Sequence, residues 1–94
     1  MEILELRDGY DRRKTPAVNR YRRMTLDEIK ALSGEVEFIA RDGTARRCRI
    51  NGRIKTWKTD PARIEVPVKY GMYECHRMET REALDRLIVR IPLS

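Results

Sequence analysis

The sequence predicts one small, mainly β domain, built as a five-stranded antiparallel barrel with two short helices. Three observations lead to this fold class. Several short segments alternate apolar and polar residues with the period of two that is typical of strands. Turn signals rich in glycine, asparagine or proline separate these segments at short intervals. The chain of 94 residues, of which 40% are hydrophobic, suffices for one domain with one modest core.

Residues 1–24 carry few signals of regular structure, and we expect them to form a basic arm that is partly disordered alone and becomes ordered on a partner. A solvated tail without a role is the competing interpretation. Residues 25–94 are expected to be the single barrel domain. The side chains of the arm that we expect to assist binding are Arg12, Arg13, Lys14, Arg20, Arg22 and Arg23.

A short helix is predicted after the arm, because Thr25 and Glu28 match the S/T-x-x-E capping box. Leu26 and Ile29 then share one face, and Gly34 suits the C-terminal cap. So short a helix is stable only when it packs on another element.

Residues 35–50 predict a β-hairpin, because the apolar period changes to two at residue 35. A three-residue loop ending in Gly43 separates the two strands, and glycine tolerates the positive φ that such a loop requires. This loop places Val36 opposite Cys48, which keeps the apolar side chains of both strands on one face.

Two more strands are expected to follow, and a third is uncertain. Asn51-Gly52 predicts a turn into a strand over 53–59. Residues 62–70 alternate most clearly, and Pro67, which lacks an N–H, predicts an edge strand or a bulge there. The segment 72–78 fits a short strand or a loop equally well.

The last part of the chain predicts a second helix and a final strand. Thr80 is expected to cap the helix, with Ala83, Leu84 and Leu87 as its buried face. Residues 88–93 alternate again and predict the terminal strand.

This order of elements over residues 34–94 resembles the small SH3-like barrels, including the Tudor and KOW-type domains. The glycine pattern of a KOW motif is missing around Gly34, so the resemblance implies the barrel and no ribosomal or transcriptional function. An OB-like barrel, which also has five strands and a helix, is the alternative. The run KTWKTDPARIEVPVKYGMYE, residues 55–74, is also similar to short uncharacterised proteins of bacteria and their phages, which implies a bacterial or phage-encoded origin and no particular activity.

Several classes of protein are excluded by composition. No apolar run approaches the roughly 18 residues that a membrane span requires, and the first residues lack the pattern of a secretory signal, so we expect a cytoplasmic protein. Cys48 and Cys75 are expected to be reduced thiols that fill the core. With His76 as the only histidine they are too few for a structural zinc site, and we expect no metal and no cofactor.

No residue pattern indicates catalysis. Cys75 and His76 are adjacent, and neighbours on an extended chain point to opposite faces, so they are not expected to form a catalytic dyad. The carboxylates are scattered singly, and the sequence contains no GxGxxG, GxxxxGK[ST] or HExxH motif. We therefore predict that the protein is not an enzyme.

The net charge of +6 is concentrated in one segment. Residues 44–59 contain six basic residues and no acid, whereas the rest of the chain has 15 basic and 15 acidic residues. Strand alternation turns Arg47 and Arg49 toward solvent. The sequence thus predicts a basic hairpin over 44–59 that binds nucleic acid through Arg46, Arg47, Arg49, Arg53, Lys55, Trp57 and Lys58.

Two registers at the Asn51-Gly52 turn leave the position of Trp57 open. A two-residue type I′ turn pairs Ile50 with Arg53 and turns the indole toward the core. A three-residue loop pairs Ile50 with Ile54 and places the indole beside the exposed arginines, where it can stack a base. We favour the second register because it leaves no lysine in the core, although a bulge can also return Trp57 to the core.

The leading hypothesis is a non-catalytic nucleic-acid-binding module, for RNA or DNA, that uses the basic hairpin. The alternative is a protein-interaction or self-assembly module, for example a phage-encoded accessory protein, that docks on an acidic protein surface. Pro67 and Pro92 as marks of edge strands motivate the alternative, together with a cluster formed by Tyr70, Met72, Tyr73 and Met78.

Overall fold

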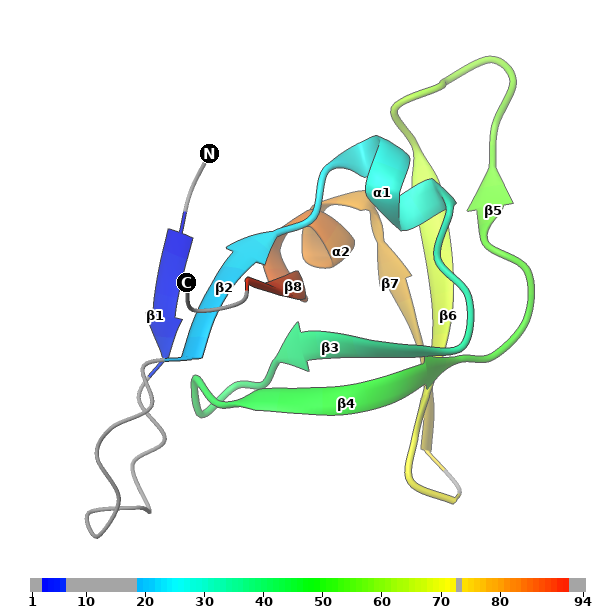
Figure 1. The fold of residues 1–94 in the computed structure, drawn as a ribbon. Coiled ribbons are helices and arrows are strands. Elements are labelled where there is room, and N and C mark those ends of the chain that lie inside the picture. The colour runs from blue at the N-terminus through cyan, green and yellow to red at the C-terminus, as the bar shows by residue number, and fades with distance from the viewer. Residues whose placement is uncertain (1–2, 7–18, 73, 92–94) are drawn as a thin grey trace, which may run out of the picture.

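A computed structural model describes residues 3–6, 19–72 and 74–91, which form one strongly curled antiparallel sheet and two short helices (Figure 1). The sheet forms a half-barrel, which confirms the predicted mainly β fold of small-barrel type. The elements in chain order are β1 (Ile3–Leu6), β2 (Asn19–Arg23), α1 (Leu26–Lys30), β3 (Glu35–Ile39), β4 (Ala45–Ile50), β5 (Lys55–Thr56), β6 (Ile64–Tyr70), β7 (Glu74–Glu79), α2 (Thr80–Arg86) and β8 (Leu87–Ile91).

Strand β6 is the junction of the sheet. The strand order is β1-β2-β8-β3-β4-β6-β5, and β7 also pairs with β6. One edge of β6 therefore bonds to β7, while the other edge bonds to β5 near the start of the strand and to β4 near its end. From this junction the β3–β4 and β6–β7 hairpins diverge, as Figure 1 shows.

The hydrophobic core lies on the concave side of the sheet and is centred on β6. Ile64, Val66 and Val68 alternate inward and are at most 1% exposed. Fully buried Ile29 of α1 and Ala83 of α2 close the core from the helices. The remaining members of this cluster are Val36, Phe38, Cys48, Met78 and Leu87. Burial of apolar surface is the main favourable contribution to folding, so this cluster holds the curled sheet together.

Helix α1 begins with the predicted capping box. The Thr25 hydroxyl accepts a hydrogen bond from the Glu28 N–H at 3.3 Å, and the Glu28 carboxylate accepts one from the Thr25 N–H at 3.0 Å. Arg22 of β2 donates two further bonds to that carboxylate, at 2.6 and 2.7 Å, and lowers the pKa of Glu28 to about 2. The helix ends at Lys30, so Gly34 is not its cap and instead adopts a φ of 70° before β3.

The β3–β4 hairpin has the predicted register. Val36 is the partner of Cys48, and the Ala40 N–H donates to the Thr44 carbonyl at 2.9 Å. Gly43 has a φ of 84°, which explains the glycine in the connecting turn.

The predicted hairpin at Asn51-Gly52 is wrong in both of its registers. Ile50 pairs with Val68 of β6 and not with Arg53 or Ile54. Strand β5 also pairs with β6 and not with β4. Residues 44–59 therefore form no hairpin. The residues of a turn do not reveal that β6, a strand later in the chain, pairs with both β4 and β5.

The prediction that Pro67 lies in an edge strand is also wrong, because β6 is paired along both edges. Along β6, the ladder with β5 ends at Glu65 and the ladder with β4 begins at Val68. Pro67 faces the interval between them, where its carbonyl accepts a hydrogen bond from the Asn51 N–H at 2.8 Å. The missing proline N–H therefore falls where the partner strand is interrupted, and no ladder bond is lost.

The predicted boundary between arm and barrel does not match the sheet. Strands β1 and β2 pair with each other, and β2 pairs with β8 from Arg20 opposite Ile91 to Arg23 opposite Ile88. Part of the predicted arm thus belongs to the sheet, and the ambiguous segment after Gly71 is strand β7. These segments explain why the described part of the chain has more strands than the predicted five.

Helix α2 lies where the sequence predicts it, but Thr80 has another role. Glu79 occupies the N-cap position, and Thr80 is the first helical residue. The Thr80 hydroxyl accepts a bond from the Ile64 N–H at 2.9 Å, which joins the helix to the start of β6. Of the predicted apolar face, Ala83 is buried and Leu84 is half-buried, while Leu87 is buried but belongs to β8 and not to the helix.

The two cysteines occupy different environments. Both are free thiols, but only Cys48 fills the core, at 5% exposure, and burial raises its pKa to about 11. Cys75 is exposed, so the prediction that it fills the core is wrong.

The methionines allow a matched test of the core. We expect Met78→Ala to lower the free energy of unfolding by about 2–5 kcal/mol, because Met78 is fully buried against β6. Met72→Ala should change it by less than about 0.5 kcal/mol, because this side chain is 76% exposed. Chemical unfolding followed by circular dichroism measures both changes. Equal losses for the two variants would contradict the assignment of the core.

Thiol reactivity tests the placement of the cysteines. With an aromatic disulfide reagent at pH 8, we expect one reactive thiol in the folded protein and two in denaturant, because a buried protonated thiol reacts slowly. Cys75→Ser should leave no fast-reacting thiol in the folded protein. Rapid modification of Cys48 in that variant would show that the core is open there.

Candidate nucleic-acid interface

Arg47 and Arg49 lie on the convex face of β4 and are exposed, as strand alternation predicted. Strand β3 places Glu37 opposite Arg47 and Glu35 opposite Arg49. Neither arginine forms an ion pair with any residue that the structure describes, and Glu37 bonds to Arg90 at 3.1 Å instead. The facing carboxylates therefore weaken the local positive potential without occupying the two guanidinium groups.

The convex face is a mixed charged surface. Lys69 of β6 pairs with Arg49, so Glu35, Arg49 and Lys69 form one row across three strands. The basic residues thus follow one another along the sequence, but in the folded sheet carboxylates of a neighbouring strand lie beside them.

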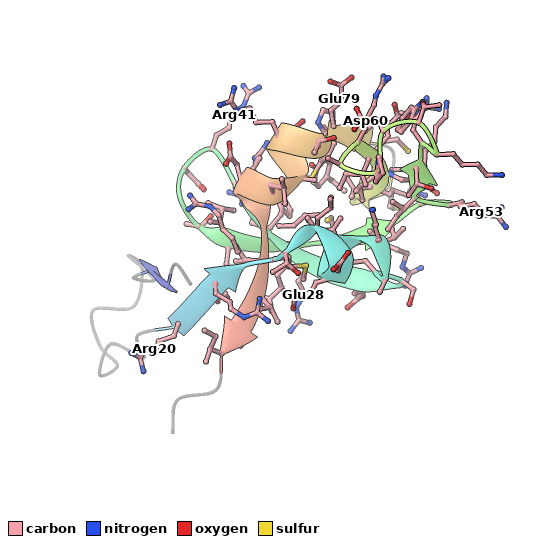
Figure 2. The ribbon with its side chains drawn as sticks, turned by 90° about the horizontal axis from the view of Figure 1, so that it is seen from above. Arg20, Glu28, Arg41, Arg53, Asp60 and Glu79 are labelled. Atoms are coloured by element: carbon pink, nitrogen blue, oxygen red, sulfur yellow. The ribbon has the colours of Figure 1, made fainter. Side chains whose placement is uncertain are left out.

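A second group of predicted binding residues follows β4. Arg53 and Lys58 are exposed and have no ion pair within the described ranges, and Figure 2 shows Arg53 pointing away from the sheet. Trp57 is half-buried, with the guanidinium of Arg63 at 4.1 Å and the ammonium of Lys55 at 5.2 Å from its ring. The indole thus already makes cation–π contacts, and no strand ladder aligns it with Arg47 and Arg49.

Arg46 belongs to the opposite face of β4. It pairs with Phe38, whose side chain points inward, but lies toward the open end of the half-barrel and remains exposed. Arg46 donates to Asp42 at 2.9 Å, and Asp42 also accepts bonds from the hydroxyl and N–H of Thr44, at 2.6 and 3.1 Å. The hydroxyl of Thr44, its N–H and then Arg46 lower the pKa of Asp42 to about 2.

A groove of about 780 Å³ lies between the two diverging hairpins, where their inward positions continue beyond the core. Val68 pairs with His76 and Tyr70 with Glu74, so these residues lie on the concave side. The ring centroids of Phe38 and Tyr70 are 4.9 Å apart, and those of Tyr70 and His76 are 6.4 Å apart. The groove is lined by Phe38, Ala40, Arg41, Arg46, Arg47, Tyr70, Gly71, Glu74, Cys75, His76, Glu82 and Arg86.

Helix α2 supports one wall of this groove. Nε2 of His76 lies 2.9 Å from both carboxylate oxygens of Glu82, and since an ionised carboxylate only accepts, this nitrogen donates. Glu82 also accepts a bond from Arg86 at 3.1 Å, while another nitrogen of Arg86 donates to the Ile39 carbonyl at 2.9 Å. These bonds join β7, α2 and β3 and fix the orientation of the imidazole.

The sequence interpretation placed Cys75 and His76 on opposite faces, and this is confirmed. Cys75 pairs with Lys69 of the convex face, whereas His76 pairs with inward-facing Val68, although both residues contribute to the lining of the groove. The groove itself was not predicted. If strand alternation is extended through the turn at Gly71, it predicts that Tyr70 and His76 share one face. It does not predict that β3 and α2 lie beside them.

The arginines of the predicted arm that the structure describes lie in β2. Arg22 is bonded to Glu28, and Arg23 donates to the Asp85 carbonyl at 3.1 Å. Arg20 is half-buried. The other basic residues predicted to assist binding, Arg12, Arg13 and Lys14, lie outside the described residues.

The cluster that motivated a protein-interaction module does not form one surface. Met78 is in the core, whereas Met72 is exposed at the β6–β7 turn. Tyr70 is half-buried and lines the groove, and Tyr73 and Pro92 lie outside the described residues.

Within residues 3–6, 19–72 and 74–91, no three His, Cys, Asp or Glu side chains are grouped to hold a metal ion. None of the described helices has the length and apolar character of a membrane span. No protein-family model, curated protein or solved structure matches the chain. Function is therefore inferred from the arrangement of the side chains alone.

The β3–β4 turn gives a prediction on pH. Because the pKa of Asp42 in the folded protein lies below its ordinary value of 3.8, ionised Asp42 stabilises the fold above that pH, and this stabilisation is lost as the pH falls toward about 2. Carbon-detected NMR titration should show the low midpoint. Thr44→Val should raise it more than Arg46→Ala, since Thr44 provides the largest contributions. A midpoint near 3.8 in the unmodified protein would contradict the described turn.

Proposed function

We propose that the protein is a non-catalytic nucleic-acid-binding module that holds the sugar-phosphate backbone against β4 and the segment after it. The observation that carries this proposal is the location of the charge, because the whole net charge of +6 arises from residues 44–59. Exposed cations that lack an internal partner are free to replace the counterions of phosphates. Those in this segment, within the part of the chain that the structure describes, are Arg47, Arg49, Arg53 and Lys58.

The dimensions of the basic surface suit an extended backbone. A strand rises about 3.3 Å per residue, so β4 alone covers roughly 20 Å, and Arg53 follows three residues after its end. One strand of a duplex carries about six phosphates over the same length. The carboxylates of Glu35 and Glu37 beside the arginines weaken the attraction of this surface for phosphates. We therefore expect binding of moderate strength that depends steeply on salt.

Fluorescence anisotropy with labelled oligonucleotides tests the proposal. If four cations contact phosphates, the logarithm of the binding constant should fall with the logarithm of salt concentration with a slope of about −3.5 for a duplex. Arg49→Ala should weaken binding and reduce the magnitude of this slope by about 0.9. Arg81→Ala, which removes an exposed charge from α2, is the matched control and should leave the slope unchanged.

Two results would overturn the proposal. The first is no binding at about 50 mM salt, and the second is binding without salt dependence. Unchanged binding after the double reversal of Arg47→Glu and Arg49→Glu would move the contact away from β4.

The second candidate, a protein-interaction or self-assembly module, is favoured by one observation. In the described part of the chain β7 pairs only with β6, and Glu74 to Arg77 are all exposed. A free strand edge is able to pair with a strand of another chain. A monomeric mass at all concentrations in sedimentation would exclude self-assembly, whereas a dimer that fails to bind oligonucleotides would favour this candidate.

A further inference from the structure

The groove between the hairpins offers aromatic surface to a ligand. The side chain of His76 is 45% exposed, and its ring and that of Tyr70 are inclined by only 26°. Phe38 supports Tyr70 from the core, and the bond to Glu82 holds the imidazole in place. A nucleobase is planar, and stacking on such rings is favourable for every base. The volume of about 780 Å³ lies within the range of small-ligand sites.

Charge is distributed unequally over the two walls of the groove. The β3–β4 hairpin contributes Arg41, Arg46 and Arg47, all exposed. Arg46 is paired with Asp42, whereas Arg41 and Arg47 form no ion pair among the described residues. The opposite wall contributes Glu74 and Glu82 beside His76, together with Arg86, which bonds to Glu82 at 3.1 Å. A phosphate is therefore attracted more strongly to the β3–β4 wall than to the other, where one guanidinium is paired with one of two carboxylates, and the aromatic wall is left to the base.

The alternative stacking platform is already occupied. The guanidinium of Arg63 lies 4.1 Å from the ring of Trp57, so a base there has to displace a cation–π contact. The rings in the groove are recessed on the concave side of the sheet. Bases within a duplex are stacked on one another, and only a base that has left the stack reaches such a recess.

We propose that this groove receives one unstacked base, with a flanking phosphate on the unpaired Arg41, and that the ligand of the protein is therefore single-stranded nucleic acid. The inference rests on the proposed function, since it names the class of nucleic acid that the basic surface serves. The convex arginines hold the backbone of the strand, and the groove distinguishes a strand with accessible bases from one without them.

A pair of strands with equal charge separates base recognition from phosphate binding. The two probes are a labelled strand of twelve thymidines and a twelve-unit abasic strand with the same phosphates. We expect the thymidine strand to bind roughly five- to tenfold more tightly at equal salt. His76→Ala should remove most of this difference without changing binding of the abasic strand. His76→Phe should restore it, because phenylalanine offers an aromatic ring for stacking although it lacks the nitrogen that bonds to Glu82. Met72→Ala, which changes an exposed, uncharged side chain outside the groove lining, is the matched control.

The single histidine and the single tryptophan report on the two sites independently. In NMR titrations, stacking in the groove should shift the ring protons of His76 upfield with the thymidine strand and not with the abasic strand. Quenching of Trp57 fluorescence without any shift at His76 would place the base at the indole and overturn the inference.

The remaining outcomes distinguish the inference from the proposed function. Equal affinity for both probes, each with a steep salt dependence, overturns the groove assignment and leaves the backbone-binding module standing. A duplex that binds as tightly as a single strand with the same number of phosphates overturns it as well. Failure of both probes to bind at about 50 mM salt overturns the inference together with the proposed function.

Discussion

The pairing of β6 with three other strands is the constraint on which the rest of the structure depends. β7 occupies one edge, while β4 and β5 share the other in succession. Since β4 remains paired with β3 over its whole length but meets β6 only at its end, the two hairpins cannot lie in one plane. The sheet curls around Ile64, Val66 and Val68, and its concave side becomes the core. The groove is the part of that side that the core does not fill.

The same pairing determines how the basic segment is presented. If residues 44–59 formed an isolated hairpin, its arginines would make one uniform positive face. Pairing with β3 instead sets Glu35 and Glu37 opposite Arg49 and Arg47. Acids on neighbouring strands limit repulsion among the arginines and keep the sheet stable, yet they leave the guanidinium groups exposed. Such a surface favours reversible, salt-sensitive contact over tight binding.

The two faces of the sheet carry different chemistry because strand alternation separates them. On β4, Arg47 and Arg49 point outward, while Arg46 shares the inward face with Phe38. On β7, Cys75 points outward while His76 points inward. The groove brings Arg41 and Arg46 together with the rings of Tyr70 and His76. The proposed division between backbone contact and base contact follows from this geometry.

Features that depend on neighbours a few residues apart were predicted correctly. The capping box of Thr25 and Glu28, the pairing of Val36 with Cys48, and the opposite directions of Cys75 and His76 all belong to this class. Helical and strand periods fix such relations, because they depend on the local backbone conformation. The same reasoning wrongly predicted Cys75 to be a core residue, since the alternation of side chains along a strand does not show which face of that strand is covered by the core.

The sequence by itself determined the fold class, the positions of most elements and the segment that carries the net charge. Only the tertiary structure decided that β4 and β5 share β6, that Trp57 lies under Arg63, and that Tyr70 and His76 meet Phe38 and α2 in a groove. The physical reason is that a strand chooses its partner by the free energy of the whole core. That choice joins residues far apart in the chain, and no local pattern records it.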